Sequence, residues 1–204
     1  MVTDYRAFGM TVIGASHIKR GTVCQDFSLS CELPDRRISV VCDGHGGADY
    51  FRSDRGSRFA AEAFTECMKD PDVISVLSAA ATQKQQYIHI EQLIKSIIAR
   101  WNKLVERDIK EHPFSEDELS GISGKAQRRY ETGERLQSAY GTTLIGVILT
   151  ENFWLGLQIG DGKCVAVSKD GEFTQPIPWD EQCFLNVTTS ICDENAAKEF
   201  RFCF

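Results

Sequence analysis

The chain has 204 residues, of which 42% are hydrophobic and 25% charged, with a formal net charge of −6. These values are typical of one globular domain with a sizeable core, and they argue against nucleic acid as a partner. No run of about 20 apolar residues predicts a membrane span, so we expect no membrane partner. The eight cysteines form no C-x-x-C pair, and the first residues do not resemble a signal peptide. We therefore expect reduced thiols in a cytoplasmic protein.

The first third of the sequence predicts β-strands. β-forming residues dominate residues 8–18 (FGMTVIGASHI) and residues 26–33 (DFSLSCEL). Residues 38–43 (ISVVCD) are nearly all apolar, which is typical of a strand that is buried on both faces. This strand leads directly into residues 44–47 (GHGG), where the glycines allow a sharp turn or a close approach to a bound group.

The middle of the sequence predicts helices. Residues 54–70 place apolar side chains on one helical face, and Pro71 suits the first turn of a second helix. Apolar residues recur at helical spacing through residues 90–109, so we expect a long helix laid on a sheet, with Trp101 in the core. Residues 112–137 are polar and interrupted by glycine, and we expect a loop with one short helix there, not a separate domain.

Strands return in the last third. They are expected at residues 142–150, within residues 153–168 on either side of the GDG turn, and at residues 173–178, with residues 169–172 (KDGE) as a hairpin turn. Strands followed by helices and then by strands indicate a layered α+β domain, because alternating βαβ units would mix the two along the chain. We therefore expect a single domain over residues 1–204.

Acidic residues stand at the ends of three predicted strands. Asp43 follows one apolar strand, Asp26 begins another, and Asp161 lies between two glycines after a third. Such acids could converge on one edge of a sheet, where their oxygen atoms suit Mg²⁺ or Mn²⁺ better than Zn²⁺. The alternatives are a turn or capping role for Asp26 and a tight Asp-Gly turn at Asp161, neither of which needs a metal.

Several motifs, taken in order, resemble one enzyme family. QD precedes DGHGG, and YGTTL and GDG follow it, as in the metal-dependent serine/threonine protein phosphatases of type 2C. The resemblance runs from GASHIKRG to PWDEQC…TTSICD and is closest to a bacterial branch. It implies a four-layer α-β-β-α sandwich with two Mn²⁺ or Mg²⁺ ions between its sheets. We expect this sandwich to be incomplete at its C-terminal end.

The resemblance also implies a role for each matching residue. Asp43 would bridge both ions, Gly44 would offer its carbonyl to one of them, and Asp26 would hold ion-bound water. Asp161 matches an acid of a further, weaker metal site. His45 would protonate the departing serine or threonine oxygen. Metal ions supply a nucleophilic water near neutral pH, and a positioned acid assists the basic leaving group. No protein nucleophile is needed.

The sequence departs from the family pattern in three places. Gln25 stands where many relatives carry an acid, although QD also occurs in the family. Gly21 stands where relatives carry a phosphate-binding arginine, so Lys19 and Arg20 are either substitutes or ordinary surface cations. The sequence also lacks the family's later Asp-Gly strand end and final aspartate. We expect a natural truncation, part of a longer chain, or a protein that a partner completes through an open C-terminal edge.

The leading hypothesis is a phosphatase that hydrolyses phosphoserine or phosphothreonine in a protein substrate. A second hypothesis is a pseudophosphatase that binds phosphorylated proteins but lacks a complete metal site. A third is a hydrolase of small phosphoesters, because a fold does not fix its substrate. Two tightly held ions would favour an enzyme, whereas one ion or none would favour a binding module.

Overall fold

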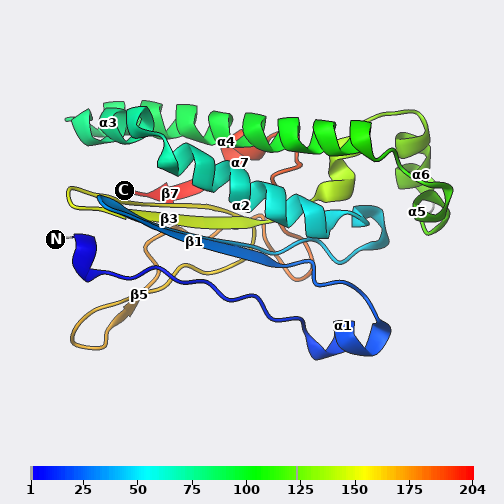
Figure 1. Ribbon diagram of the computed structural model, residues 1–204, viewed down its shortest axis with the longest axis horizontal. Helices are drawn as coiled ribbons and strands as arrows, with labels where there is room; N and C mark the ends of the chain where they lie inside the picture. The colour runs from blue at the N-terminus through cyan, green and yellow to red at the C-terminus, as the bar shows by residue number, and fades with distance from the viewer. Residues whose placement is uncertain (1, 123) are drawn as a thin grey trace.

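A computed structural model describes residues 2–122 and 124–204 and shows helices packed on an antiparallel sheet (Figure 1). Within these residues the sheet has five strands in the order β1-β2-β3-β4-β7, and each neighbouring pair is antiparallel. Their bounds are β1 Phe27–Leu33, β2 Arg36–Cys42, β3 Leu144–Thr150, β4 Trp154–Ile159 and β7 Arg201–Cys203. Two further strands, β5 (Ala166–Val167) and β6 (Phe173–Thr174), form a separate small sheet.

Three helices cover one face of the large sheet (Figure 1). They are α2 (Ser53–Lys69), α3 (Pro71–Ala79) and α4 (Gln83–Glu111). The shorter helices are α1 Ala15–Arg20, α5 Glu116–Ser120, α6 Gly124–Glu131 and α7 Ala196–Glu199. Single 3₁₀ turns lie at Val2–Asp4, Ala48–Tyr50 and Leu136–Tyr140. None of the helices in the described part of the chain is long and apolar enough to cross a membrane.

The core lies between the helical layer and the sheet. Trp101 is fully buried, as predicted, and its indole nitrogen donates a hydrogen bond to the Gly56 carbonyl at 3.1 Å. Gly146 of β3 leaves room for a helix side chain, because a Cβ atom there would lie 2.4 Å from the Phe64 ring. Hydrophobic burial of this kind is the main force that holds such a layer to its sheet.

The predicted α+β class is confirmed, and the described residues form one helical layer on one five-stranded sheet. Below that sheet lie the N-terminal segment and the β5–β6 hairpin, in place of a second large sheet and its helices (Figure 1). The predicted turn at residues 169–172 joins β5 to β6, with Gly171 at a φ of 84°. Residues 112–137 contain two short helices, α5 and α6.

Two strand predictions were wrong. Residues 8–18 form no strand: the chain runs without regular structure to Gly14 and then forms α1. The first part of this segment contacts β1 through side chains, since the Thr11 and Ser28 hydroxyls lie 2.8 Å apart, so it crosses the sheet face and does not join an edge. Of residues 173–178, only Phe173 and Thr174 form a strand, which is β6.

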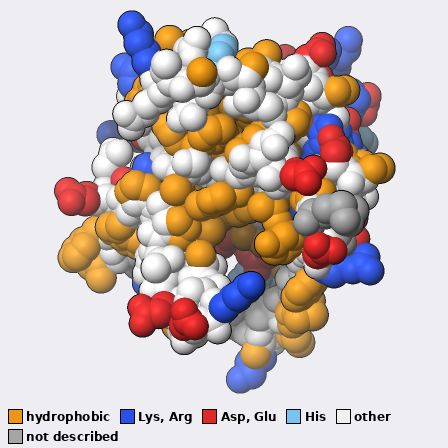
Figure 2. Space-filling view, turned by 90° about the vertical axis from the view of Figure 1, so that its left-hand side faces the viewer, with side chains coloured by type: hydrophobic (Ala, Val, Ile, Leu, Met, Phe, Trp, Pro, Cys, Tyr) orange, Lys and Arg blue, Asp and Glu red, His pale blue; other side chains and the backbone are white. Residues whose placement is uncertain are grey.

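The end of the molecule that carries both termini is rich in exposed apolar groups. Figure 2 shows a band of hydrophobic side chains there, between the helical layer and the segments below the sheet. The predicted acidic residues lie at the opposite end of the strands.

Candidate functional site

Strand pairing brings the predicted acids to one end of the sheet. Phe27 pairs with Cys42, so Asp26 and Asp43 are neighbours just beyond the ends of β1 and β2. Leu144 pairs with Ile159, which places Asp161 beyond the end of β4 on the same side. The antiparallel register therefore explains why residues far apart in the sequence gather here.

Asp43 carries the electrostatic signature of this cluster. The residue remains exposed, but the protein atoms around its carboxyl and the neighbouring Asp26 raise its pKa to about 6. Asp161 adds to this rise, whereas the charge of His17 opposes it. Negative charges that are held close together disfavour ionisation. Without a bound cation, Asp43 therefore lies in a region with an excess of negative charge.

The Asp43 backbone is fixed by the strand beside it. Its N–H donates to the Thr143 hydroxyl at 3.1 Å, and its carbonyl accepts from the Thr143 N–H at 2.9 Å and the Thr142 hydroxyl at 3.0 Å. A cavity of about 350 Å³ opens next to it, and Asp26, Asp43 and Gly162 are part of its lining. Cys42, by contrast, is buried, and burial raises the pKa of its thiol, as expected for a packed strand residue.

His45 lies in the turn that follows Asp43. Its backbone N–H donates to the Gly141 carbonyl at 3.1 Å, and its ring meets the edge of Tyr50 with the ring centres 4.7 Å apart. Burial lowers the pKa of His45, whereas Asp193 and Asp161 act to raise it. The imidazole is therefore half-buried within reach of the acidic cluster, which suits a group that exchanges protons.

The donor atoms suit a hard divalent cation. Asp26 and Asp43 offer carboxylate oxygens, and a cation beside them would relieve the repulsion that raises the pKa of Asp43. Asp161 lies beyond the end of β4, and its carboxylate accepts a hydrogen bond from the Thr188 hydroxyl at 3.2 Å. Within residues 2–122 and 124–204, however, no group of three or more His, Cys, Asp or Glu side chains is placed to hold a metal ion. The described residues therefore show no complete metal site.

The predicted phosphate-binding cations point to solvent. Lys19 and Arg20 are exposed at the end of α1, and the Arg20 Nε donates to the Ser16 carbonyl of the same helix at 3.2 Å. His17, on the same helix, is half-buried, and its charge influences Asp43. Sequence reasoning did not single out His17, although this residue lies within GASHIKRG, where the resemblance begins.

Sequence reasoning also missed the groups that surround His45. The Gln25 side chain and the Ser53 hydroxyl both donate to the His45 carbonyl, each at 2.9 Å. Asp193 lies close enough to influence the pKa of His45, although it is distant in the sequence. Gln25 belongs to QD and Asp193 ends TTSICD, so both lay in motifs of the resemblance, whereas no motif marked Ser53.

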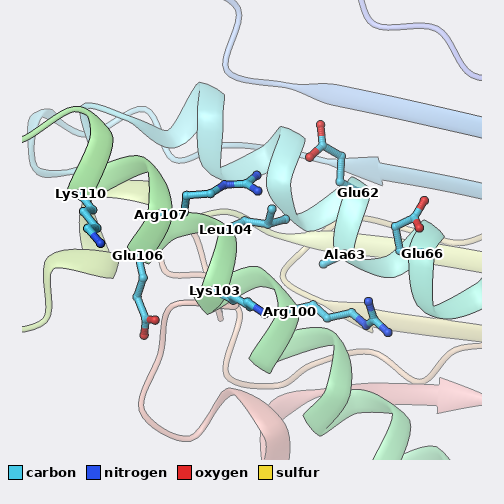
Figure 3. Close-up of a pocket in the computed structure, with 9 residues that line it drawn as sticks. All are labelled: Glu62, Ala63, Glu66, Arg100, Lys103, Leu104, Glu106, Arg107 and Lys110. Atoms are coloured by element: carbon cyan, nitrogen blue, oxygen red, sulfur yellow. The ribbon is translucent and has the colours of Figure 1, made fainter.

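A larger groove of about 500 Å³ lies elsewhere, between α2 and α4 (Figure 3). Ala63 and Leu104 line it, flanked by Glu62 on one helix and by cations such as Arg100 and Arg107 on the other. None of the predicted site residues lines this groove. We therefore place the functional site at the sheet end.

Comparison with known proteins identifies the family of the chain. A search of curated proteins found no match. The family model described as "Protein phosphatase 2C" matches residues 13–204. This range includes Asp26, Asp43, His45 and Asp161 and covers nearly the whole chain. The chain therefore belongs to the protein phosphatase 2C family.

Proposed function

We propose that this chain is a Mn²⁺- or Mg²⁺-dependent phosphatase that removes phosphate from phosphoserine or phosphothreonine in protein substrates. Family membership supports phosphatase chemistry in general. One observation carries the proposal of metal-dependent chemistry. Asp26 and Asp43 lie side by side, just before the turn that contains His45, and a bound cation would relieve the repulsion between them. The eight free cysteines support a reducing, cytoplasmic setting.

In this proposal Asp43 and the Gly44 carbonyl hold the ions, with Asp26 beside them and Asp161 at a weaker site. Bound Mn²⁺ or Mg²⁺ supplies Lewis acidity, which neutralises phosphate charge and lowers the pKa of water. His45 donates a proton to the serine or threonine oxygen as the P–O bond breaks. This proton is needed because an alkoxide is a poor leaving group, and its donation is worth about 10²–10⁴ in rate. Lys19 and Arg20 attract the phosphorylated segment.

The test is hydrolysis of a phosphothreonine peptide with and without Mn²⁺, using the wild-type chain, Asp43→Asn and Asp170→Asn. Asp170 is an exposed turn acid with the same charge, so it controls for the loss of one carboxylate. We expect Mn²⁺-dependent activity in the wild type and in the control, and a loss of at least about 100-fold in Asp43→Asn. Activity that survives Asp43→Asn would refute the proposal.

One observation favours a second candidate, a binding module for phosphorylated proteins. The described residues form no metal group of three or more acidic, His or Cys side chains. Calorimetric titration with Mn²⁺ separates the two functions, because two tightly bound ions per chain support the enzyme and one or none supports the binding module. Comparing the peptide with small phosphate esters then tests the third candidate, a small-phosphoester hydrolase.

The proposed partner of the site is a phosphorylated protein, and the net charge of −6 gives no support to nucleic acid. Strand β7 lies at one edge of the large sheet. Association through that edge is a second, separate proposal, since an edge strand offers unpaired backbone groups to another chain. Size measurement in solution tests it.

A further inference from the structure

The Gln25 side chain lies against the loop that carries His45. Its amide nitrogen lies 2.9 Å from the His45 carbonyl oxygen and 2.7 Å from the Ser53 hydroxyl. The Ser53 hydroxyl itself donates to the same carbonyl at 2.9 Å. Ser53 is fully buried and Gln25 half-buried, so water competes little for these contacts. The three groups form a closed hydrogen-bonded ring.

The chemistry of this ring requires an amide at position 25. A carbonyl oxygen can only accept, so the Gln25 atom beside it must be the nitrogen. A glutamate of the same shape has two acceptor oxygens and no donor at neutral pH. It would place an oxygen against the His45 carbonyl and lose that hydrogen bond, or turn away and lose both. A glutamate at position 25 would therefore not replace Gln25 in this role.

The backbone of Gln25 holds the same loop from a second side. Its carbonyl accepts from the Gly44 N–H at 3.2 Å. Gly44 is packed so closely that a Cβ atom would lie 2.5 Å from the Gln25 carbonyl oxygen and 2.7 Å from that of Ser53. The His45 N–H is held by the Gly141 carbonyl. Both backbone polar groups of His45 are thus fixed, and they set where its ring can point.

We propose that Gln25 is a positioning residue for His45, which it orients through hydrogen bonds to the backbone and not through the metal ions. The inference rests on the proposed function of His45 as the proton donor. Gln25 touches neither the substrate nor the departing oxygen, so its effect must pass through His45.

The test compares two substrates that differ in their need for a proton. A phosphothreonine peptide has a basic leaving oxygen, whereas the p-nitrophenolate ion leaves without protonation. For Gln25→Met, which removes the donors without adding charge, and for Gln25→Glu, we expect kcat on the peptide to fall about 10-fold. On p-nitrophenyl phosphate we expect a change of less than about 2-fold. KM for the peptide should change little.

A double-variant comparison makes the test specific. His45→Ala alone should show the same substrate-selective loss, and adding Gln25→Met to it should cause no further loss. Gln92→Glu on the exposed face of α4 is the matched control for the added charge and should behave like the wild type. Equal losses on both substrates, or a full additional loss in the His45→Ala background, would overturn the proposal.

A measurement that does not depend on catalytic activity tests this inference separately from the proposed function. If the wild type hydrolyses neither substrate, the proposed function fails, but the His45 ring can still be observed by NMR in histidine-labelled protein. The chain has four histidines, so the signals can be assigned. Gln25→Met and Gln25→Glu should shift the His45 signals and leave those of His89 and His112 in place. Unchanged His45 signals in both folded variants would refute the positioning role.

Discussion

The Arg52 guanidinium binds both carboxylate oxygens of Glu118, with its Nε at 2.7 Å from one and its Nη2 at 2.9 Å from the other. Arg52 is buried at the start of α2, one residue before Ser53 of the His45 network, and lies over the ring of Phe114. The ion pair therefore ties the segment after α4 to the helix start that supports the candidate site.

The first prediction concerns this ion pair. Desolvation acts to raise the pKa of Glu118, but the hydrogen bonds from Arg52 and Ser115 outweigh it and lower the pKa to about 2. We expect Glu118→Gln to cost about 2 kcal/mol at pH 7, because it leaves the buried Arg52 without this charged partner. For a chain of this length that corresponds to a fall of roughly 4–8 °C in Tm. The exposed Glu116 on the same helix is the control, and Glu116→Gln should change Tm by less than about 2 °C.

The sign of the pH dependence follows from the lowered pKa. Glu118 stabilises the fold fully above its ordinary value of 4.5, and this stabilisation is lost as the pH falls toward about 2. The difference in unfolding free energy between wild type and Glu118→Gln should therefore shrink across that window. Denaturant titrations at several pH values measure it. A difference that stays constant from pH 7 to pH 2 would contradict the assigned cause.

The second prediction is that Asp43 destabilises the metal-free fold. Its pKa is raised to about 6, so its neutral form is the more compatible with folding, and stability is lost as the pH rises through about 6. Without metal, Asp43→Asn should be more stable than the wild type at pH 7.5 by about 1 kcal/mol after solvent screening is allowed for, and about equal at pH 4. Mn²⁺ should then raise the Tm of the wild type and not that of the variant.

Thermal unfolding in EDTA, and again with Mn²⁺, measures both effects. Asp170→Asn is the control and should follow the wild type at every pH. An Asp43→Asn variant that is no more stable than the wild type at pH 7.5 would show that the acids in this cluster do not repel one another as inferred.

The sequence predicted that Asp26 and Asp43 lie at strand ends, because strand ends and short motifs are local features. Both acids adjoin short segments rich in β-forming or apolar residues. Asp193 could not be placed beside His45, because it reaches the site only through the packing of a distant segment, and no motif marked Ser53. Residues 8–18 were misread as a strand because β-forming residues also suit an extended segment laid across a sheet face, where no ladder forms.

The third prediction separates two glycines of the same turn. A Cβ atom on Gly44 would lie within 2.7 Å of two backbone oxygens, whereas one on Gly46 would meet nothing closer than 3.7 Å. Gly44→Ala must therefore displace the loop, and we expect it to cost about 1–3 kcal/mol and to lower kcat at least 10-fold. Gly46→Ala is the matched control and should stay within about 2-fold of the wild type. Similar activity of the two variants would show that close packing at Gly44 does not hold His45 in place.

The last prediction concerns the exposed cations Lys19 and Arg20 of α1. In the described part of the chain neither forms an ion pair with an acid, so both charges are available to a phosphorylated segment. We expect Lys19→Ala/Arg20→Ala to raise KM for a phosphothreonine peptide about 3- to 5-fold with kcat unchanged, because exposed charges contribute modestly and at a distance. The effect should disappear at about 0.5 M salt, where such charges are screened. Lys103→Ala/Arg107→Ala removes the same charge from the groove in Figure 3 and should leave KM unchanged. An equal rise of KM in both double variants would assign the effect to net charge and not to α1.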